Sequence, residues 1–552
     1  MKKQWHEELD INELASRFGS PIWVIGKQQI KENVRQFLSF TNSAFRILYP
    51  VKCNPAPSVL ECIAEEGCGA DCSSLSEINL ALISGFKWEN IAYNSPSQDF
   101  KTVKIVLDNG GIWVCDDVDL LKEIDNNQDS GKGQIWIRIN PKQNVSYSKT
   151  SKNQELMAHG SSSSKFGIPE EDLPELLSKI TIKISGLHLH VGTQMDNLDS
   201  FVSALNSLHE NANIAIELGH PIKHLDIGGG LGIPFNDQDN FPSIFDWTSR
   251  LNQLKQKNYE YYTEPGHALV GDAVGLITTV KSIKHSRGKT WGICDVGTDQ
   301  LAKITLLHWP HKVVSSSGSP LPFNGNDTLA GPLCFAGDNL LESTCLKDVK
   351  KDDRLLITNV GAYTFALSNS FNGRIAPAWL LWEEGAIKIT EAESAFSRLM
   401  MQNHYWKKTI QREFEQPISR ELFEALKSDY LHTEIENDRY TILEFNQIGE
   451  NKFNATVDFI SSVDFVSMPT AIRVIGNLCL VAALHKHGYT SKNRPVMGKK
   501  VQLEYGASLK TGLNKINIFL SDEIRKEEQS WTVLASFEVD DKSCKGCLIL
   551  TI

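Results

Sequence analysis

The sequence predicts an α/β protein whose first half is a parallel (β/α)8 barrel. Between residues 46 and 264, short runs of β-branched or aromatic residues alternate repeatedly with segments of helical period. Polar side chains and glycines fall at the ends of these runs, which is where barrel enzymes gather their functional groups. A doubly wound open sheet has the same alternation, so periodicity alone leaves that fold as the alternative.

The expected strands, in chain order, are Arg46–Val51, Gly69–Cys72, Ile91–Tyr93, Ile112–Cys115, Gln134–Ile139, Ile184–His190, His224–Ile227 and Tyr261–Glu264. Expected helices lie at Pro57–Glu66, Leu75–Ser84, Val118–Ile124, Leu173–Ile180 and Leu198–Leu218. The strand segments are rich in β-branched and aromatic residues, whereas the helical segments repeat their apolar residues with a period of about 3.6 residues.

Composition indicates an ordinary soluble protein of 552 residues, with 41% hydrophobic and 22% charged residues, and excludes wholesale disorder. The net charge of −11, without a long basic run, argues against a nucleic-acid partner. The longest apolar stretch, Ile472 to Leu484, contains Arg473 and Asn477 and is too short to span a bilayer. Eleven scattered cysteines and a polar segment after Met1 predict a cytoplasmic enzyme.

Chemically distinctive residues follow the expected strands at Lys52, Asp71, His190, Gly228-Gly229-Gly230, Glu264 and Gly266. Glycine allows backbone N–H groups to approach an anion closely, and barrels commonly bind phosphate in the loops after their seventh and eighth strands. The glycines here fall at those two loops. We therefore expect a site for a phosphorylated ligand beside a lysine and a glutamate.

A histidine pair leaves a second interpretation open. His188 and His190 alternate onto one face of the sixth expected strand, so they could be two metal ligands. Either histidine taken singly is more often structural. Metal-dependent barrel hydrolases usually carry such a pair near the first strand, so we expect no metal.

An ordered set of motifs resembles the fold-type III pyridoxal-phosphate (PLP) decarboxylases, the family of diaminopimelate and ornithine decarboxylases. The motifs are Tyr49–Pro55, Gly69–Ser74, Ser164–Gly167, His188–Gln194, Asp226–Gly230, Glu264–Gly266, Gly331–Cys334 with Asp338, and Gly361–Tyr363. Each motif alone is weak, but their common order is specific. The resemblance implies a PLP-binding barrel at residues 27–275 and a β-rich domain made of residues 1–26 and 276–390.

The resemblance also implies a role for each matching residue. Lys52 would bind PLP covalently, His190 would stack on the pyridine ring and Glu264 would face the ring nitrogen. A carboxylate there favours the protonated ring, which is the better electron sink when CO₂ departs. The implied phosphate ligands are Thr193, Gly228, Gly229, Gly230, Gly266 and Tyr363, and Asp71 and Arg138 match further positions near the cofactor.

Cys334 matches a cysteine that helps to protonate the product, and that reaches the site across the interface of a homodimer with shared active sites. The alternative is a buried cysteine acting as a small hydrophobe, but the nearby Asp338 favours a function. Amino-acid racemases of the same fold are another alternative. They typically place an arginine at the ring nitrogen, so Glu264 favours decarboxylation.

Two departures from the family pattern bear on the substrate. His267 stands where diaminopimelate decarboxylases have an arginine for the distal carboxylate. Phe335 stands where they have a glutamate, and ornithine-type enzymes an aspartate, for the distal ammonium. With Asp338 these residues form the expected substrate-binding set. Because an apolar ring cannot pair with an ammonium group, we expect a modified, conjugated or carrier-tethered amino acid rather than free diaminopimelate, lysine or ornithine.

Residues 395–552 extend beyond the family's ordinary chain. Expected helices lie at Ser394–Lys408, Ser419–Asp429 and Pro469–His485, and expected strands at Tyr440–Phe445, Ala455–Ile460, Val501–Tyr505, Lys515–Leu520, Trp531–Glu538 and Cys547–Thr551. A long helix with antiparallel strands resembles the α+β hotdog fold of acyl-thioester hydrolases and dehydratases. That likeness implies an acyl carrier protein or a coenzyme A thioester as a partner. The alternative is a dimerisation module without chemistry, attached to a diaminopimelate- or ornithine-type decarboxylase.

Overall fold

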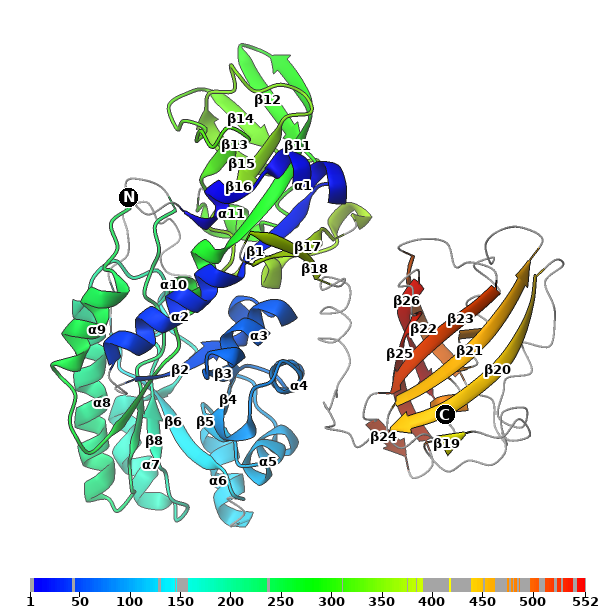
Figure 1. Cartoon of the computed structure of the whole chain (residues 1–552). Helices are drawn as coiled ribbons and strands as arrows, with labels where there is room; N and C mark the ends of the chain where they lie inside the picture. Colours follow the sequence, from blue (N-terminus) through cyan, green and yellow to red (C-terminus); the bar gives the residue numbers. More distant parts are fainter. Residues whose placement is uncertain are drawn as a thin grey trace. The chain divides into compact units, whose positions relative to one another are not determined.

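The computed structural model divides the chain into two compact units, Met1–Gln402 and Asn403–Ile552 (Figure 1). In the first unit it describes residues 4–41, 45–127, 131–143, 145, 157–235, 239–309, 311–374, 376–383 and 385–390. In the second it describes residues 416–417, 438–449, 452–461, 474–475, 478–479, 481–483, 486, 497–505, 512–520, 524–527, 530–539 and 544–551.

The predicted barrel is confirmed. Its strands are β2 (Phe45–Pro50), β3 (Gly69–Cys72), β4 (Ile91–Asn94), β5 (Ile112–Cys115), β6 (Gln134–Asn140), β8 (Gly186–His188), β9 (His224–Asp226) and β10 (Glu260–Thr263). Each strand pairs in parallel with the next, and β10 pairs with β2. This last pairing closes the cylinder and rules out the open doubly wound sheet.

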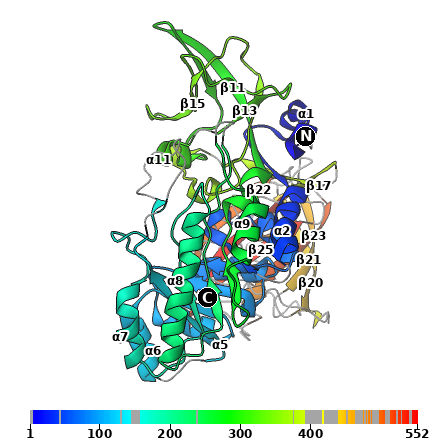
Figure 2. The same ribbon diagram turned by 90° about the vertical axis from the view of Figure 1, so that its left-hand side faces the viewer.

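Helices cover the outside of the barrel, so β3, β4 and β5 are buried at every position. These helices are α3 (Pro57–Glu65), α4 (Leu75–Ile83), α5 (Phe100–Asp108), α6 (Val118–Asn127), α7 (Leu173–Lys179), α8 (Asp199–Glu217) and α9 (Ile244–Asn252). Figure 2 shows α7, α8 and α9 on one side of the cylinder. Side-chain caps fix several helix starts. Ser74 accepts from the Glu77 N–H at the start of α4, and Asp99 accepts from the Thr102 N–H at the start of α5.

Four barrel strands, β2, β8, β9 and β10, end earlier than the sequence predicts, and two of these ends affect predicted site residues. β8 ends at His188, so His190 lies in the following loop, and β10 ends at Thr263, so Glu264 is the first residue after the strand. The pairing of β8 with β9 stops at His188 and Asp226. Beyond it the chain turns at Gly228, whose φ of 67° belongs to the left-handed region that favours glycine.

A second, mixed sheet completes the first unit, in the order β15-β14-β12-β11-β1-β17-β18, with β16 pairing to β11 and β13. Its strands are β1 (Ile22–Gly26), β11 (Val274–Ser286), β12 (Lys289–Cys294), β13 (Val313–Ser315), β14 (Asp327–Ala330), β15 (Asn339–Thr344), β16 (Arg354–Ile357), β17 (Ala378–Glu383) and β18 (Ala386–Thr390). Helices α1 (Ile11–Phe18), α2 (Lys27–Thr41), α10 (His267–Val270) and α11 (Ala302–Leu307) connect or flank the two sheets. The N-terminal strand β1 thus lies between strands from much later in the chain.

The second unit contains a separate, mainly antiparallel sheet in the order β19-β20-β21-β23-β25-β26-β22, with β24 on β25. Its strands are β19 (Gln416–Pro417), β20 (Asp438–Gly449), β21 (Lys452–Ser461), β22 (Met497–Tyr505), β23 (Gly512–Leu520), β24 (Ile524–Glu527), β25 (Ser530–Val539) and β26 (Cys544–Thr551). Every strand predicted in this region is found. The sequence did not predict the short, charged β24.

Part of the predicted helix Pro469–His485 is described, and those residues are helical. Val474, Ile475, Leu478, Cys479, Val481, Ala482 and Ala483 are all buried. Alternate residues of β21 and β23, such as Phe453, Ala455, Ile516 and Ile518, are buried too. The predicted helices Ser394–Lys408 and Ser419–Asp429 lie outside the described residues. Within the described part of the chain, no helix is long and apolar enough to cross a membrane.

The packing of β1 leads to a prediction for stability. Trp23 on β1 is fully buried and stacks on Trp379 of β17, with ring centroids 5.2 Å apart. Trp23→Ala should lower the free energy of unfolding by about 3–5 kcal/mol, because it opens a large cavity. Chemical denaturation measures this loss. Trp291→Ala on β12, where the ring is partly exposed, is the matched control, and an equal loss there would contradict the prediction.

Candidate active site

Lys52 lies at the mouth of the barrel, in a single 3-10 turn that follows β2. Its amine pairs with the Asp71 carboxylate on the neighbouring strand β3, and its side chain remains 42% exposed. Burial lowers the pKa of Lys52, but the charges of Asp71 and Glu264 outweigh burial and raise it above its ordinary value. Burial, together with the charge of Glu264, raises the pKa of Asp71. The lysine is therefore a partly exposed cation that the neighbouring carboxylates hold in its protonated form.

Glu264 follows the end of β10, interacts electrostatically with Lys52 and is 5% exposed. Its Oε1 lies 3.2 Å from Nε2 of the fully buried His188. Burial would raise the pKa of Glu264, but His188, Lys52 and Arg138 together lower it. Burial and the Glu264 charge raise the pKa of Asp226 well above its ordinary value. These shifts favour the charged form of Glu264 and the neutral form of Asp226.

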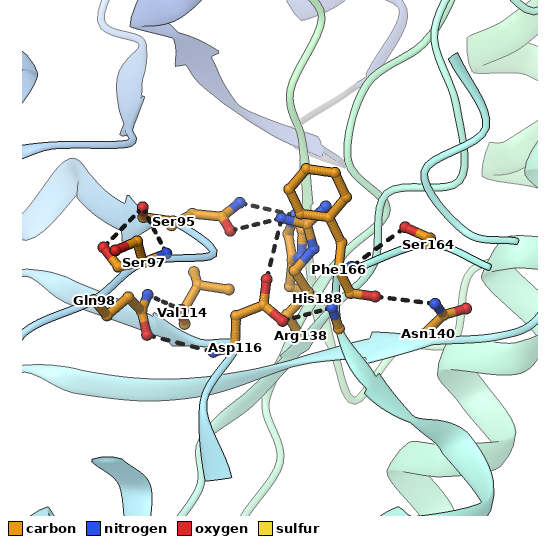
Figure 3. A network of polar contacts seen from close by, with 12 residues as sticks. Ser95, Ser97, Gln98, Val114, Asp116, Arg138, Asn140, Ser164, Phe166 and His188 are labelled. Carbon is orange, nitrogen blue, oxygen red and sulfur yellow. Dashed lines mark hydrogen bonds and ion pairs between the residues drawn. The ribbon is translucent and has the colours of Figure 1, made fainter. Parts of the chain in front are cut away.

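Arg138 links two sides of the barrel mouth (Figure 3). Its Nη1 donates to Asn94 Oδ1 at 3.1 Å and lies 3.7 Å from the Asp116 carboxylate. Its guanidinium carbon lies 4.5 Å from the centroid of the Phe166 ring. Asp116 also accepts a hydrogen bond from the Gly167 N–H at 2.5 Å. The Ser164–Gly167 motif is therefore fastened to the mouth of the barrel.

His190 is held in one tautomer. Its Nδ1 accepts from the Gly229 N–H at 3.2 Å, which leaves the proton on Nε2. Burial lowers the pKa of His190 well below its ordinary value, so the ring is neutral at neutral pH. The His159 ring lies 4.9 Å from it, and burial lowers the pKa of His159 to about 4. Sequence reasoning missed His159 because no motif surrounds it.

The interpretation of His188 and His190 as a metal-binding pair does not fit this geometry. Among the described residues, His188 comes together with Asp226 and Glu264, whose polar atoms all lie within 4.8 Å of one another, and His190 is not part of that group. The side chains of His188 and His190 therefore serve different parts of the site.

Glycines bring the loops after β9 and β10 into close contact. A Cβ on Gly229 would lie 2.0 Å from the Glu264 carbonyl oxygen, and one on Gly230 would lie 2.3 Å from the Gly192 oxygen. A Cβ on Gly266 would lie 3.1 Å from both Tyr363 Oη and Cys53 Sγ. Thr193 Oγ1 is 3.5 Å from His267 Nδ1. The structure thus brings the predicted phosphate ligands together, although the Gly229 N–H points to His190.

His267 is buried in an aromatic cluster rather than exposed as a cation. Its ring lies 4.9 Å from that of Tyr363 and 5.6 Å from that of Trp309. Burial, with the nearby Lys303, lowers the pKa of His267 well below its ordinary value. Lys303 itself is fully buried, and sequence reasoning missed it because it lies in no recognised motif.

The three predicted site residues of the β-rich domain, Cys334, Phe335 and Asp338, lie on one loop. Cys334 is exposed, its backbone N–H donating to Asn372 Oδ1 at 2.8 Å, and Phe335 is 48% exposed. The buried Asp338 carboxylate accepts from the Thr298 N–H at 2.7 Å and the Leu333 N–H at 2.8 Å. Asp338 therefore holds the loop that carries Cys334, and a contact between Asp338 and substrate stays a prediction.

Together these residues define a barrel enzyme whose lysine and glycine-rich loops suit a phosphorylated aldehyde cofactor. A family model described as pyridoxal-dependent decarboxylase, pyridoxal binding domain, matches residues 27–271. Diaminopimelate decarboxylase of Methanothermobacter thermautotrophicus is 30% identical over 407 residues, 71% of this chain and 93% of that protein. The chain therefore belongs to the diaminopimelate decarboxylase family of PLP-dependent amino-acid decarboxylases.

Three further comparisons also find proteins similar to this chain. The diaminopimelate decarboxylase of Zymomonas mobilis is 28% identical, over 67% of this chain and 89% of that protein. The crystal structure of the Helicobacter pylori diaminopimelate decarboxylase complexed with L-lysine has a TM-score of 0.63 and 25% identity, and covers 71% of this chain and 99% of that one. A crystal structure from Aquifex aeolicus has a TM-score of 0.60 and 28% identity, and covers 69% and 90%.

The residues present fit PLP. Glu264 Oε1 and Asp71 Oδ1 are buried without an aligned hydrogen bond, so each has capacity for a donor on the cofactor. A Cβ on Gly229, Gly230 or Gly266 would prevent the close contacts that these loops make with neighbouring residues. The neutral His190 provides a flat apolar face. The cofactor of this decarboxylase is therefore PLP.

Lys52 provides the first test of the site. Lys52→Ala should abolish the covalent link to PLP, because no amine would remain at that position to bond to the aldehyde. Borohydride reduction followed by peptide mass spectrometry should place the cofactor on Lys52 in the natural chain and nowhere in the variant. Lys27→Ala, at a lysine that pairs with Glu383, is the control. Unchanged labelling of Lys52→Ala would contradict the assignment.

Proposed function

We propose that this decarboxylase uses Lys52, Asp71, Arg138, His190 and Glu264 around the cofactor ring. Thr193, Gly228, Gly229, Gly230, Gly266 and Tyr363 hold its phosphate group. The observation that carries this proposal is the cluster of Lys52, Asp71 and Glu264, three ionisable groups that shift one another's pKa values. The close contact of the glycine loops with Glu264 supports the phosphate assignment.

The site residues have distinct tasks. Bound PLP supplies an electron sink for the pair left behind when CO₂ departs. Glu264, whose lowered pKa favours the carboxylate, would stabilise a proton on the ring nitrogen and so strengthen that sink. Lys52 would hold the aldehyde end of the cofactor, and Asp71 would keep the lysine amine in position. His190 would support one face of the ring, and its Nδ1 accepts the hydrogen bond that orients Gly229.

Cys334 and Phe335 act in this proposal from the second subunit of a homodimer. Both are exposed on the surface of a single chain, on a loop that Asp338 holds in shape. An exposed thiol is available to donate a proton to the α carbon, and it remains beyond reach of bulk water once a partner covers it. Each site would then need both subunits.

We further propose that the substrate is a modified, conjugated or thioester-tethered amino acid. His267 is neutral, buried and surrounded by aromatic rings, so it is unsuited to bind a distal carboxylate. Phe335 offers no charge to a distal ammonium group. The second candidate substrate is diaminopimelate itself, which is favoured by the names of the relatives in the comparisons.

The second unit is proposed to be a hotdog-like domain that handles the acyl thioester of coenzyme A or of a carrier protein. Its connectivity supports this. The helical residues 474–475, 478–479 and 481–483 follow β21 and precede β22, yet β23, β25 and β26 lie between those two strands in the sheet. The chain between β21 and β22 must therefore cross the sheet, and the apolar helical residues there are buried. A dimerisation module is the alternative.

Mass spectrometry of the full-length holoenzyme tests the substrate proposal. We would compare free diaminopimelate, lysine and ornithine with aminoacyl groups on a carrier protein and on coenzyme A. We expect loss of CO₂ from the tethered amino acids and little from the free ones. Efficient turnover of free diaminopimelate would contradict the proposal and favour the second candidate.

Glu264 tests the electron-sink argument. Glu264→Gln should lower kcat by roughly 100-fold, because a neutral amide no longer stabilises the protonated ring. The affinity for PLP should change only a few-fold, since phosphate contacts remain. Glu260→Gln is the control, because Glu260 begins the same strand but is half exposed. Undiminished turnover of Glu264→Gln would contradict the assignment.

A further inference from the structure

Lys303 is a buried amine without a carboxylate partner among the residues that the structure describes. It lies on α11, its side chain is 0% exposed, and its Nζ donates to the Ala362 carbonyl oxygen at 2.7 Å. The rings of Phe235 and Trp309 lie 4.8 and 5.1 Å from the same nitrogen. Rings and one carbonyl group stabilise an ammonium group only partly. Within the described part of the chain, no carboxylate stabilises the charged form of this amine.

Every titratable group around Lys303 is uncharged at neutral pH. Burial, followed by the Lys303 charge itself, lowers the pKa of both His267 and His311 well below the ordinary value. Burial raises the pKa of Cys53 to about 12, and burial also raises the pKa of Tyr363. In addition, His267 Nε2 and both ring nitrogens of His311 are buried and make no aligned hydrogen bond with the described residues. The described titratable neighbours of Lys303 thus provide no negative charge.

The cluster lies directly behind the proposed phosphate site. Ala362, which accepts from Lys303, is the residue before Tyr363 in the chain. His267 follows Gly266, and its ring lies 4.9 Å from the Tyr363 ring. On its other side, His267 Nδ1 lies 3.5 Å from Thr193 Oγ1. A phosphate group held by Thr193, Gly266 and Tyr363 would therefore be one side chain away from Lys303.

We propose that Lys303 is the buried counter-charge of the cofactor's phosphate group, acting from behind the residues that contact it. This inference rests on the phosphate site of the proposed function. A phosphate monoester carries close to two negative charges above about pH 6. In a water-poor interior, that charge favours the protonated form of a nearby amine. Lys303 would be a positioning residue for the cofactor and not a catalytic one.

The proposal has a consequence for proton uptake. Without the cofactor, burial lowers the pKa of Lys303 to about 7, so above pH 7 the amine is mostly neutral. The arriving phosphate raises that pKa, and the amine then takes up a proton from solvent. The contribution of the phosphate group to the affinity for PLP should therefore fall as pH rises above 7. This contribution should fall by up to tenfold per pH unit, because one proton is taken up per phosphate bound.

Pyridoxal, which has the same aldehyde and ring but no phosphate group, is the comparison ligand. We would measure the binding of PLP and of pyridoxal to cofactor-free protein at pH 7 and 8. The proteins compared are the natural chain, Lys303→Met, Lys303→Gln and the control Lys27→Gln. Gln keeps a donor for Ala362, whereas Met keeps only the packing of the stem. Both changes should weaken PLP about tenfold or more at pH 7 and leave pyridoxal unchanged.

Calorimetry in buffers of different ionisation heat counts the protons. At pH 8, PLP should take up close to one proton more than pyridoxal in the natural chain, and no more than pyridoxal in Lys303→Met. The covalent step at Lys52 is common to both ligands, so its protons cancel in this difference. This measurement on the natural chain decides the question even if the variants do not fold, because an absent difference would overturn the proposal.

Other outcomes are equally decisive. If the Lys303 variants bound PLP and pyridoxal with equally reduced affinity, or bound PLP with unchanged affinity, Lys303 would have no interaction with the phosphate group. A raised KM with unchanged cofactor affinity would assign the charge to the substrate and also overturn the proposal. A wrong assignment of the phosphate site itself would give a different result from a wrong role for Lys303. In that case the natural chain would bind PLP no more tightly than pyridoxal, and Tyr363→Phe and Thr193→Ala would leave the affinity for PLP unchanged.

Discussion

The mutual compensation of buried charges at the barrel mouth is the constraint on which the site depends. Lys52, Asp71 and Glu264 form one electrostatic cluster, to which Arg138 of β6 also contributes. An isolated carboxylate or ammonium group in such a place would be neutralised, because burial penalises charge. Together the positive groups favour the ionised form of Glu264, and the two carboxylates favour the protonated form of Lys52. Replacing one of them therefore changes the charge state of its neighbours as well as its own.

Backbone geometry gives these charges their places. The parallel barrel brings residues from strands far apart in the sequence to one edge, and Lys52 and Glu264 come from adjacent strands, β2 and β10. The glycines after β9 then let the two loops touch, with Glu264 N–H donating to the Gly228 oxygen at 2.8 Å. The loop glycines thus position Glu264, in addition to their proposed contact with the phosphate group. The site depends on close approach of main chain to main chain.

Much of this arrangement was predictable from sequence. Alternating strand and helix patterns predicted every barrel strand, since burial on both faces leaves a strong local signal in segments such as Ile112–Cys115. Lys52 and Glu264 were predictable because motifs mark them. By contrast, the contact between His188 and Glu264, the packing of His159 near His190 and the burial of Lys303 join residues far apart in the chain. No local pattern encodes such contacts. Six of the second unit's strands were predictable by the same alternation. β19 and β24 were not, because Gln416–Pro417 is only two residues long and Ile524–Glu527 is mostly charged.

The central place of β1 affects how the chain can be made and handled. Ile22–Gly26 is synthesised well before its partners β11 and β17, which begin only at Val274 and Ala378. Until those later segments have been synthesised, the apolar strand β1 has neither of its partners and can bind chaperones or pair incorrectly. A recombinant protein that lacks β1 would lose a central strand of the second sheet, and the edges of β11 and β17 would be exposed.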